Sequence, residues 1–155
     1  MITYKKGNLL DATERYIGHG CNCQGIMGAG VALAIKNKWP KVAEVDRKRF
    51  LAGNCLLGEP DYVIVKTDPL TFVVNFYTQP RPGPCASLDA IETSIFKFFY
   101  GWAGEAKTIS LALPRIGCGL GGLKWNDVEG AINRAIKRIF DETSIEYNVV
   151  IYDLE

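Results

Sequence analysis

Two glycine-rich stretches, Gly18 to Val31 and Pro114 to Gly122, constrain the fold of this chain more than any other feature. Each follows a run typical of a buried strand and precedes a run with helical spacing. Strands that alternate with helices favour an α/β sandwich with helices on both faces of a mixed sheet. Ligands bind at the carboxyl ends of such strands, where glycines let an anion approach backbone N–H groups closely. We therefore expect the two loops to hold a diphosphate between them.

The predicted architecture is a three-layer α/β/α sandwich around a mixed central sheet of about six strands. Candidate strands cover residues 2–4, 16–21, 54–57, 62–66, 71–77, 107–113 and 147–152, with a hairpin turn at 66–70. Helices are expected from Ala29 to a stop at Trp39-Pro40, over 41–51, from a cap at Ser87 to a stop at 101–105, and from a capping box at 126–129 onward.

Composition indicates one globular domain, residues 1–155, that is 48% hydrophobic and has a formal net charge of +1. This charge gives no reason to expect a nucleic acid or an anionic membrane as a partner, and no apolar run is long enough to span a bilayer. Five cysteines, with no secretory signal ahead of them, predict reduced thiols in the cytoplasm. With a single histidine, and with Cys21 and Cys23 spaced unlike zinc ligands, we expect no metal, no other cofactor and a monomer.

The glycine spacing leaves alternatives open. The first loop reads G-x-x-G-x-G over Gly25 to Gly30 without the Gly-Lys-Ser/Thr of a P-loop, so a flexible turn packed on the sheet is the alternative. The second, Gly117 to Gly122, matches the dinucleotide fingerprint G-x-G-x-x-G, and Asp141 lies 19 residues beyond it. A Rossmann site for NAD would, however, leave the first loop without a role and only one more strand after the motif.

Four blocks of the chain together resemble the macro domain family of ADP-ribose-binding proteins. The blocks are Ile2-Thr-Tyr-Lys-Lys-Gly-Asn-Leu-Leu10, His19-Gly-Cys-Asn-Cys-Gln-Gly-Ile-Met-Gly-Ala-Gly-Val-Ala32, Leu113-Pro-Arg-Ile-Gly-Cys-Gly-Leu-Gly-Gly-Leu-Lys-Trp125 and Val149-Val-Ile-Tyr-Asp-Leu154. They occur in the family's order and span nearly the full length. The chain is most similar to the branch that holds yeast-type ADP-ribose 1''-phosphate phosphatases and the terminal ADP-ribose glycohydrolase, with phage and bacterial members.

The resemblance implies a role for each matching position. Asn8 and Leu9 would hold the adenine, although the family usually has Asp at the first of these positions. Asn22 would contact the distal ribose, and Tyr152 and Leu154 would close over the adenine and proximal ribose. The two phosphate loops and the end of the central strand would supply the other contacts: Gly28, Ala29, Gly30, Val31, Thr78, Gln79, Arg115, Ile116, Gly117, Cys118, Gly119, Leu120 and Gly121.

The resemblance also bears on the reaction. Family members that remove ADP-ribose from glutamate or DNA use a lysine where this chain has Gln79, and the protein-directed ones add an aspartate at the position of Gly121. We therefore expect a phosphatase that converts ADP-ribose 1''-phosphate to ADP-ribose and phosphate, with His19 and Asn22 as the catalytic candidates. The alternative for His19 is a buried histidine bonded to neighbouring backbone groups.

Other activities also remain open. The chain is alternatively a non-catalytic ADP-ribose reader, or a hydrolase that removes ADP-ribose from macromolecules or deacylates its esters. The expected ligands are thus ADP-ribose or ADP-ribose 1''-phosphate, with ADP-ribosylated macromolecules as further partners.

Overall fold

The computed structural model describes residues 1–101 and 109–154. It contains six strands, four α-helices and two short 3-10 helices in these residues. Their order is β1 (Ile2–Lys6), η1 (Leu9–Asp11), β2 (Tyr16–Asn22), α1 (Gly30–Lys38), α2 (Pro40–Leu51), β3 (Pro60–Thr67), β4 (Leu70–Gln79), α3 (Leu88–Gly101), β5 (Ser110–Leu113), η2 (Gly119–Gly121), α4 (Trp125–Thr143) and β6 (Asn148–Asp153).

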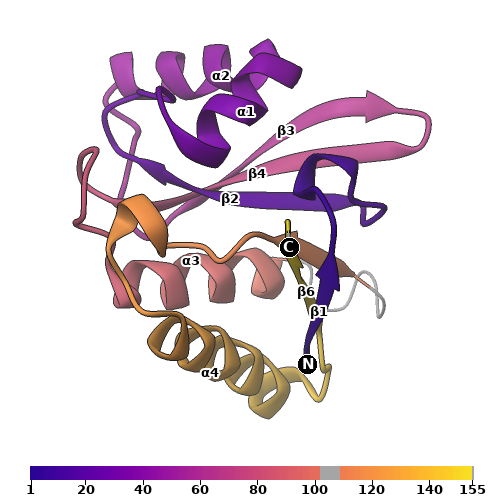
Figure 1. Cartoon of the computed structure of the whole chain (residues 1–155). Coiled ribbons are helices and arrows are strands. Elements are labelled where there is room, and N and C mark those ends of the chain that lie inside the picture. Colours follow the sequence, from indigo (N-terminus) through magenta and orange to yellow (C-terminus); the bar gives the residue numbers. More distant parts are fainter. Residues whose placement is uncertain (102–108, 155) are drawn as a thin grey trace.

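All six strands form one sheet in the order β1-β6-β5-β2-β4-β3. Only β3, at one edge, runs antiparallel to its neighbour, as expected for a strand joined to β4 by a tight hairpin. The four other pairings are parallel, so the helices cross over the sheet, with α1 and α2 on one face and α3 and α4 on the other (Figure 1). The predicted three-layer sandwich with a mixed sheet is confirmed.

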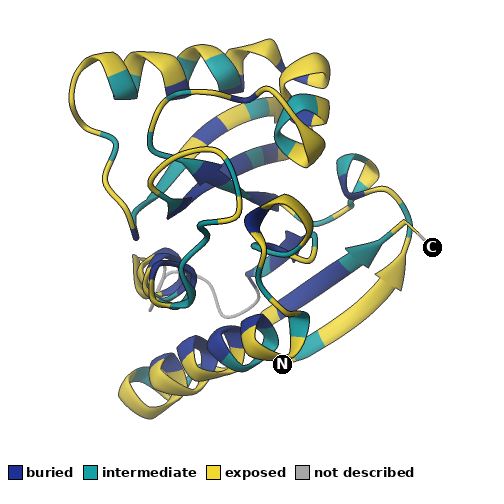
Figure 2. Cartoon of the chain, turned by 60° about the vertical axis from the view of Figure 1, so that its left-hand side comes forward, coloured by how far each residue is buried: buried dark blue, intermediate teal, exposed yellow. Residues whose placement is uncertain are grey.

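Each face of the sheet has its own apolar core, and the helices are buried along one side only (Figure 2). The larger core lies between the sheet and α3 and α4, whose buried residues recur at helical spacing. On α4 the buried residues are Val128, Ala131, Ile132, Ala135, Ile136 and Ile139. Because this spacing is visible in the sequence, it identified these helices correctly.

Two predictions about the elements are wrong. Residues 54–57 form no strand: the chain turns there, with the Glu59 N–H donating to the Leu56 carbonyl, and Leu56 and Leu57 are exposed. The capping box at 126–129 also does not form, since α4 begins at Trp125 and Lys124 occupies the N-cap. Tertiary contacts explain the earlier start, because the Trp125 indole donates to the Tyr4 hydroxyl at 3.1 Å.

Some predictions fall outside the described residues. The predicted stop of α3 extends from Gly101, its last residue, over residues 102–105, and the predicted strand over 107–113 begins at residues 107–108. Within the described residues that strand is Ser110–Leu113, and its last three residues are fully buried.

Candidate functional site

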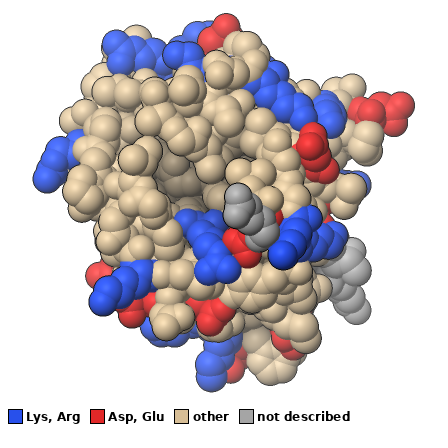
Figure 3. All heavy atoms as spheres, viewed as in Figure 1, with Lys and Arg blue, Asp and Glu red and all other residues tan. Residues whose placement is uncertain are grey.

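A cavity of about 500 Å³ lies at the carboxyl ends of β2, β4 and β5, between the two glycine-rich loops. It is visible as the hollow at the centre of the face shown in Figure 3. The volume is that of a typical small-molecule site. Its lining consists of Gly20, Asn22, Ile26, Gly28, Ala29, Gly30, Val31, Ala32, Thr78, Gln79, Pro82, Gly83, Pro114, Arg115, Ile116, Gly117, Cys118, Gly119, Leu120 and Gly121.

Asn22 shapes the first glycine loop. Its Oδ1 accepts a hydrogen bond from the Gln24 N–H at 2.9 Å, and its Nδ2 donates to the Ile26 carbonyl at 2.8 Å. The loop then enters α1 through Gly30, whose φ of +58° favours glycine. No side chain caps α1 at Ala29, and its first turn holds no acidic residue. The N–H groups of this turn are therefore available to an anion in the cavity.

The second glycine loop folds onto itself. The Ile116, Cys118 and Gly121 N–H groups donate to carbonyls of the same loop. The N–H groups of Gly117 and Gly119, by contrast, donate to no group in the described residues. Burial raises the pKa of the Cys118 thiol, so this side chain is protonated at neutral pH and is a poor nucleophile. The loop thus offers backbone donors to the cavity.

The two loops approach each other across the cavity. A Cβ atom built on Gly30 would lie 3.4 Å from Leu120 Cδ1, so residues 30 and 120 stand face to face. Leu120 is 65% exposed, and Ile26 and Val31 are also exposed at the rim. The entrance to the cavity is therefore apolar, while the donors described above are backbone groups.

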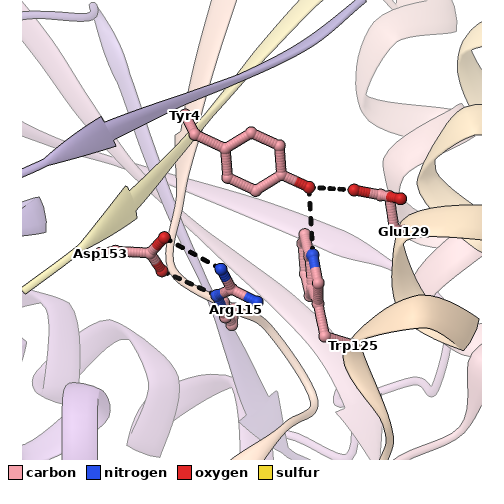
Figure 4. A network of polar contacts seen from close by, with 5 residues as sticks. All are labelled: Tyr4, Arg115, Trp125, Glu129 and Asp153. Atoms are coloured by element: carbon pink, nitrogen blue, oxygen red, sulfur yellow. Dashed lines mark hydrogen bonds and ion pairs between the residues drawn. The ribbon is translucent and has the colours of Figure 1, made fainter. Parts of the chain in front are cut away.

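Arg115 is the one charged residue among those lining the cavity, and its charge is already paired (Figure 4). Its Nε donates to Asp153 Oδ1 at 2.8 Å and its Nη2 to Asp153 Oδ2 at 3.1 Å. This bond lowers the pKa of Asp153 and raises that of Arg115. The guanidinium also lies 5.2 Å from the ring centroid of Trp125. The cavity is therefore close to neutral.

Tyr4, Trp125 and Glu129 surround the ion pair of Arg115 and Asp153 (Figure 4). The ring of Tyr4, on β1, lies 5.8 Å from the guanidinium. The Tyr4 hydroxyl bonds to the Glu129 carboxylate on α4 and accepts the Trp125 indole N–H. The group therefore joins β1, β6, α4 and the second loop, and it holds Arg115 in one orientation.

Thr78 and Gln79, at the end of β4, form the part of the cavity lining that this strand contributes. The Gln79 Nε2 donates to the carbonyls of Arg81 and Gly83, at 2.7 Å and 2.9 Å. These bonds hold the loop over residues 80–84 next to the cavity. Pro82 and Gly83 of this loop are therefore part of the cavity lining. The position of Gly121 faces this group, since a Cβ there would lie 3.5 Å from Gln79 Oε1.

The structure places His19 away from the cavity. The residue is 1% exposed, and its Nε2 lies 2.6 Å from Asn75 Oδ1 on the neighbouring strand. Burial lowers the pKa of His19 to about 4, so the ring is neutral at physiological pH. A neutral imidazole that does not line the cavity fits the alternative of a buried histidine, bonded here to the Asn75 side chain.

The residues expected around adenine form a separate group beside the cavity and do not line it. Asn8 is exposed and accepts the Leu10 N–H at 3.0 Å, whereas Leu9 is buried in the core under α1. Tyr152 packs against that core, and its hydroxyl bonds to Glu14 Oε1 at 2.5 Å. Leu154 is 79% exposed. This group adjoins the cavity where Asp153 holds Arg115.

Six lining residues were not expected from the sequence. Gly20, Ile26, Ala32 and Pro114 flank predicted residues, and their proximity along the chain was the available signal. Pro82 and Gly83 belong to the proline-rich loop over residues 80–84, for which the sequence leaves open a substrate-side loop or a rigid surface turn. The cavity brings together the predicted Asn22, Gly28 to Val31, Thr78, Gln79 and Arg115 to Gly121, and excludes the other predicted residues.

Among residues 1–101 and 109–154, no group of three or more His, Cys, Asp or Glu side chains could hold a metal ion. In the same part of the chain, no helix has the length and hydropathy needed to cross a membrane.

Comparison with known proteins finds relatives of this chain that are similar in sequence. The chain is 32% identical to a 17.5 kDa protein of the tk-vs intergenic region of Enterobacteria phage T4, covering all of this chain and 97% of the relative. It is 31% identical to the DNA ADP-ribosyl glycohydrolase of Mycobacterium tuberculosis over 95% of its length, but it spans only 42% of that relative. A Saccharomyces cerevisiae ADP-ribose 1''-phosphate phosphatase is 25% identical, covering 99% of this chain and 98% of the relative.

Solved structures of similar proteins also share the fold of this chain. The macrodomain of Mycobacterium tuberculosis DarG superimposes with a TM-score of 0.80 at 28% identity, over 98% of this chain and 97% of that structure. The model of the Macro domain family matches residues 19–132, which include both glycine loops. The chain therefore belongs to the macro domain family.

Proposed function

We propose that this protein binds ADP-ribose in the cavity between its two glycine loops and hydrolyses ADP-ribose 1''-phosphate to ADP-ribose and phosphate. The observation that carries the proposal is the pairing of two donor-rich loops across a neutral cavity. The N-terminus of α1 and the N–H groups of Gly117 and Gly119 suit a diphosphate, because backbone dipoles stabilise phosphate oxygens without a cation.

The remaining parts of the ligand follow from the position of the diphosphate. The adenine would lie beside Asn8, Leu9, Tyr152 and Leu154, next to the Arg115–Asp153 pair. Asn8 Oδ1 accepts one N–H already and keeps a lone pair for the adenine amino group. The distal ribose would lie beside Asn22, at the end of the cavity that Thr78 and Gln79 also line.

The reaction would be attack of water on phosphorus at the distal end. The new P–O bond forms as the bond from phosphorus to the C1'' oxygen breaks. One proton of the water ends on the C1'' oxygen of ADP-ribose, and the other remains on the released phosphate. Asn22 contacts the ribose and the loop that shapes the site, so it acts as a positioning group. His19 takes no part in this scheme, because it is buried and neutral.

Phosphate release from ADP-ribose 1''-phosphate tests the proposal. We expect the wild-type protein to release phosphate in proportion to enzyme concentration. Asn22→Ala should slow release by about 10-fold or more, since it loosens the loop that holds the substrate. Gln24→Ala, on the same loop, changes a side chain that makes no hydrogen bond to the described residues and is the matched control. Release at the background rate from the wild-type protein would contradict the proposal.

A binding protein without turnover is the second candidate. The uncharged pair Gln79 and Gly121 favours it, because neither residue supplies a nucleophile or a base. In that case calorimetry should detect ADP-ribose binding, with no turnover of the phosphate, of an acyl ester or of an ADP-ribosylated protein. The DNA ADP-ribosyl glycohydrolases among the relatives make ADP-ribosylated DNA a further substrate to assay.

We further propose that the protein works as a monomer in the cytoplasm. All five cysteines are free thiols, as suits a reducing compartment. Light scattering at micromolar concentration measures the mass directly, and a value near the 17.1 kDa of one chain is expected. Twice that mass would contradict the monomer.

A further inference from the structure

Thr78 and Gln79 break the usual alternation of a strand. Consecutive side chains on a strand point to opposite faces of the sheet, yet both of these residues line the cavity. The register between β2 and β4 explains this: Cys21 pairs with Tyr77 and Asn22 pairs with Gln79, so Thr78 has no partner. Thr78 is the extra residue of this β-bulge and keeps the face of Phe76, because Cβ atoms built on Gly18 and Gly20 would meet Phe76 and Thr78 Oγ1 in turn. The bulge therefore re-aims Gln79, the partner of Asn22, to the same face.

The Thr78 side chain is buried, but its hydroxyl is not used by the protein. Thr78 is 1% exposed, and its Oγ1 makes no hydrogen bond to any other described residue. Its carbonyl, in contrast, accepts the Ser87 N–H at 2.8 Å, which holds the backbone. A hydroxyl that has no protein partner and borders a cavity is free to bind a ligand or a water there.

The space next to this hydroxyl exists because residue 20 is a glycine. A Cβ atom on Gly20 would lie 2.9 Å from Thr78 Oγ1 and 3.3 Å from Ile116 Cγ1. Any side chain at residue 20 would therefore press on the hydroxyl and cover it. With glycine there, the hydroxyl remains open to the cavity, which Gly20 itself also lines.

Gln79 supplies a second oxygen from the next residue. Its Nε2 donates to the Arg81 and Gly83 carbonyls, and this fixes which end of the amide is nitrogen. Its Oε1 consequently faces Gly121, where the absence of a side chain leaves it accessible. A hydroxyl and an amide oxygen from adjacent residues thus belong to the lining of the same cavity.

We propose that Thr78 Oγ1 and Gln79 Oε1 are positioning groups that hold the attacking water at the distal end of the cavity. The inference rests on the proposed phosphatase function and names how that site orients its nucleophile. The water donates its protons to the two oxygens, which turns a lone pair toward phosphorus. As the new P–O bond forms, one of these protons moves to a phosphate oxygen, and the phosphate delivers it to the C1'' oxygen as the bond to that oxygen breaks. Neither side chain ends with a changed charge.

Kinetics of matched threonine variants test the proposal. Thr78→Val keeps the shape of the side chain but removes the hydroxyl, and we expect kcat to fall about 10- to 100-fold while KM and the Kd for ADP-ribose change less than about twofold. Thr78→Ser restores the hydroxyl and should recover most of kcat. Thr71→Val, on the same strand, removes a buried hydroxyl that donates to the Pro69 carbonyl, and it should leave kcat unchanged.

Two results would overturn the proposal. One is a Thr78→Val variant with wild-type kcat; the other is a rise in its Kd for ADP-ribose that matches the loss of kcat, since the hydroxyl would then bind the sugar. If the wild-type protein releases no phosphate, the proposed function fails, and a crystal structure with ADP-ribose still decides the placement of the water. An ordered water within hydrogen-bond distance of both oxygens supports it, and a ribose hydroxyl in that place contradicts it.

Discussion

At Gly30, the backbone conformation and the ligand site both favour a residue without a side chain. Its φ of +58° favours glycine, and a Cβ there would meet Leu120 across the cavity. We expect Gly30→Glu to weaken ADP-ribose binding at least about 100-fold, because the carboxylate would occupy the place of the diphosphate. Gly53→Glu is the matched control: its φ is +73° and no atom lies within 4 Å, so it shares only the backbone strain. Calorimetry on both variants measures the difference, and unchanged affinity in Gly30→Glu would refute the site.

His19 makes stability depend on pH. Its pKa is lowered to about 4 in the folded protein from an ordinary 6.5, so between these values the unfolded chain binds the proton more tightly. The contribution of His19 to the free energy of unfolding is therefore fully present above pH 6.5. It falls as the pH drops toward 4, by about 2 kcal/mol between about pH 7 and about pH 5. Urea unfolding at the two pH values measures this loss. His19→Gln has no proton to bind, so a loss as large in that variant would point to other groups.

At the scale of elements, α4 begins without a side-chain cap. Lys124 has the extended backbone of an N-cap residue, with φ −88° and ψ 137°, but a lysine cannot accept the free N–H groups of the first turn. Lys124→Asp would add an acceptor and a charge that suits the helix dipole, and should raise the free energy of unfolding by about 1 kcal/mol. Lys124→Ala removes the positive charge without adding an acceptor, and it is the comparison. Thermal unfolding compares the three proteins, and an equal gain in both variants would mean that the cap is not formed.

For the whole molecule, we expect the affinity for ADP-ribose to depend little on the charges of the protein. The formal net charge is +1, and the single cation lining the cavity is paired with Asp153. A ligand held by backbone dipoles loses little to screening, so we expect the Kd for ADP-ribose to rise less than about threefold between about 50 mM and about 500 mM salt. Arg115→Gln should show the same small dependence. A tenfold or larger rise in the wild-type Kd would indicate that unpaired cations bind the diphosphate.

Features that depend on neighbours along the chain were predictable. Helical spacing located α3 and α4, strand-like runs leading into the glycine loops located β2 and β5, and glycines marked both loops of the cavity. Predictions that relied on composition alone did less well. Residues 54–57 have the composition of a strand, but they turn after α2. The capping box at 126–129 has the right residues, yet the contact of Trp125 with Tyr4 sets the start of α4.

The sequence by itself determined the order of strands and helices, the two glycine loops and the membership of a family, because spacing and motifs are local properties of the chain. Tertiary structure alone decided that His19 is buried against Asn75, that Arg115 is neutralised by a residue 38 positions away, and that the 80–84 loop joins the cavity. It also decided the bulge that brings Gln79 to the same face of the sheet as Thr78. Each of these depends on which distant segments pair, and pairing follows from packing the whole core rather than from any local pattern.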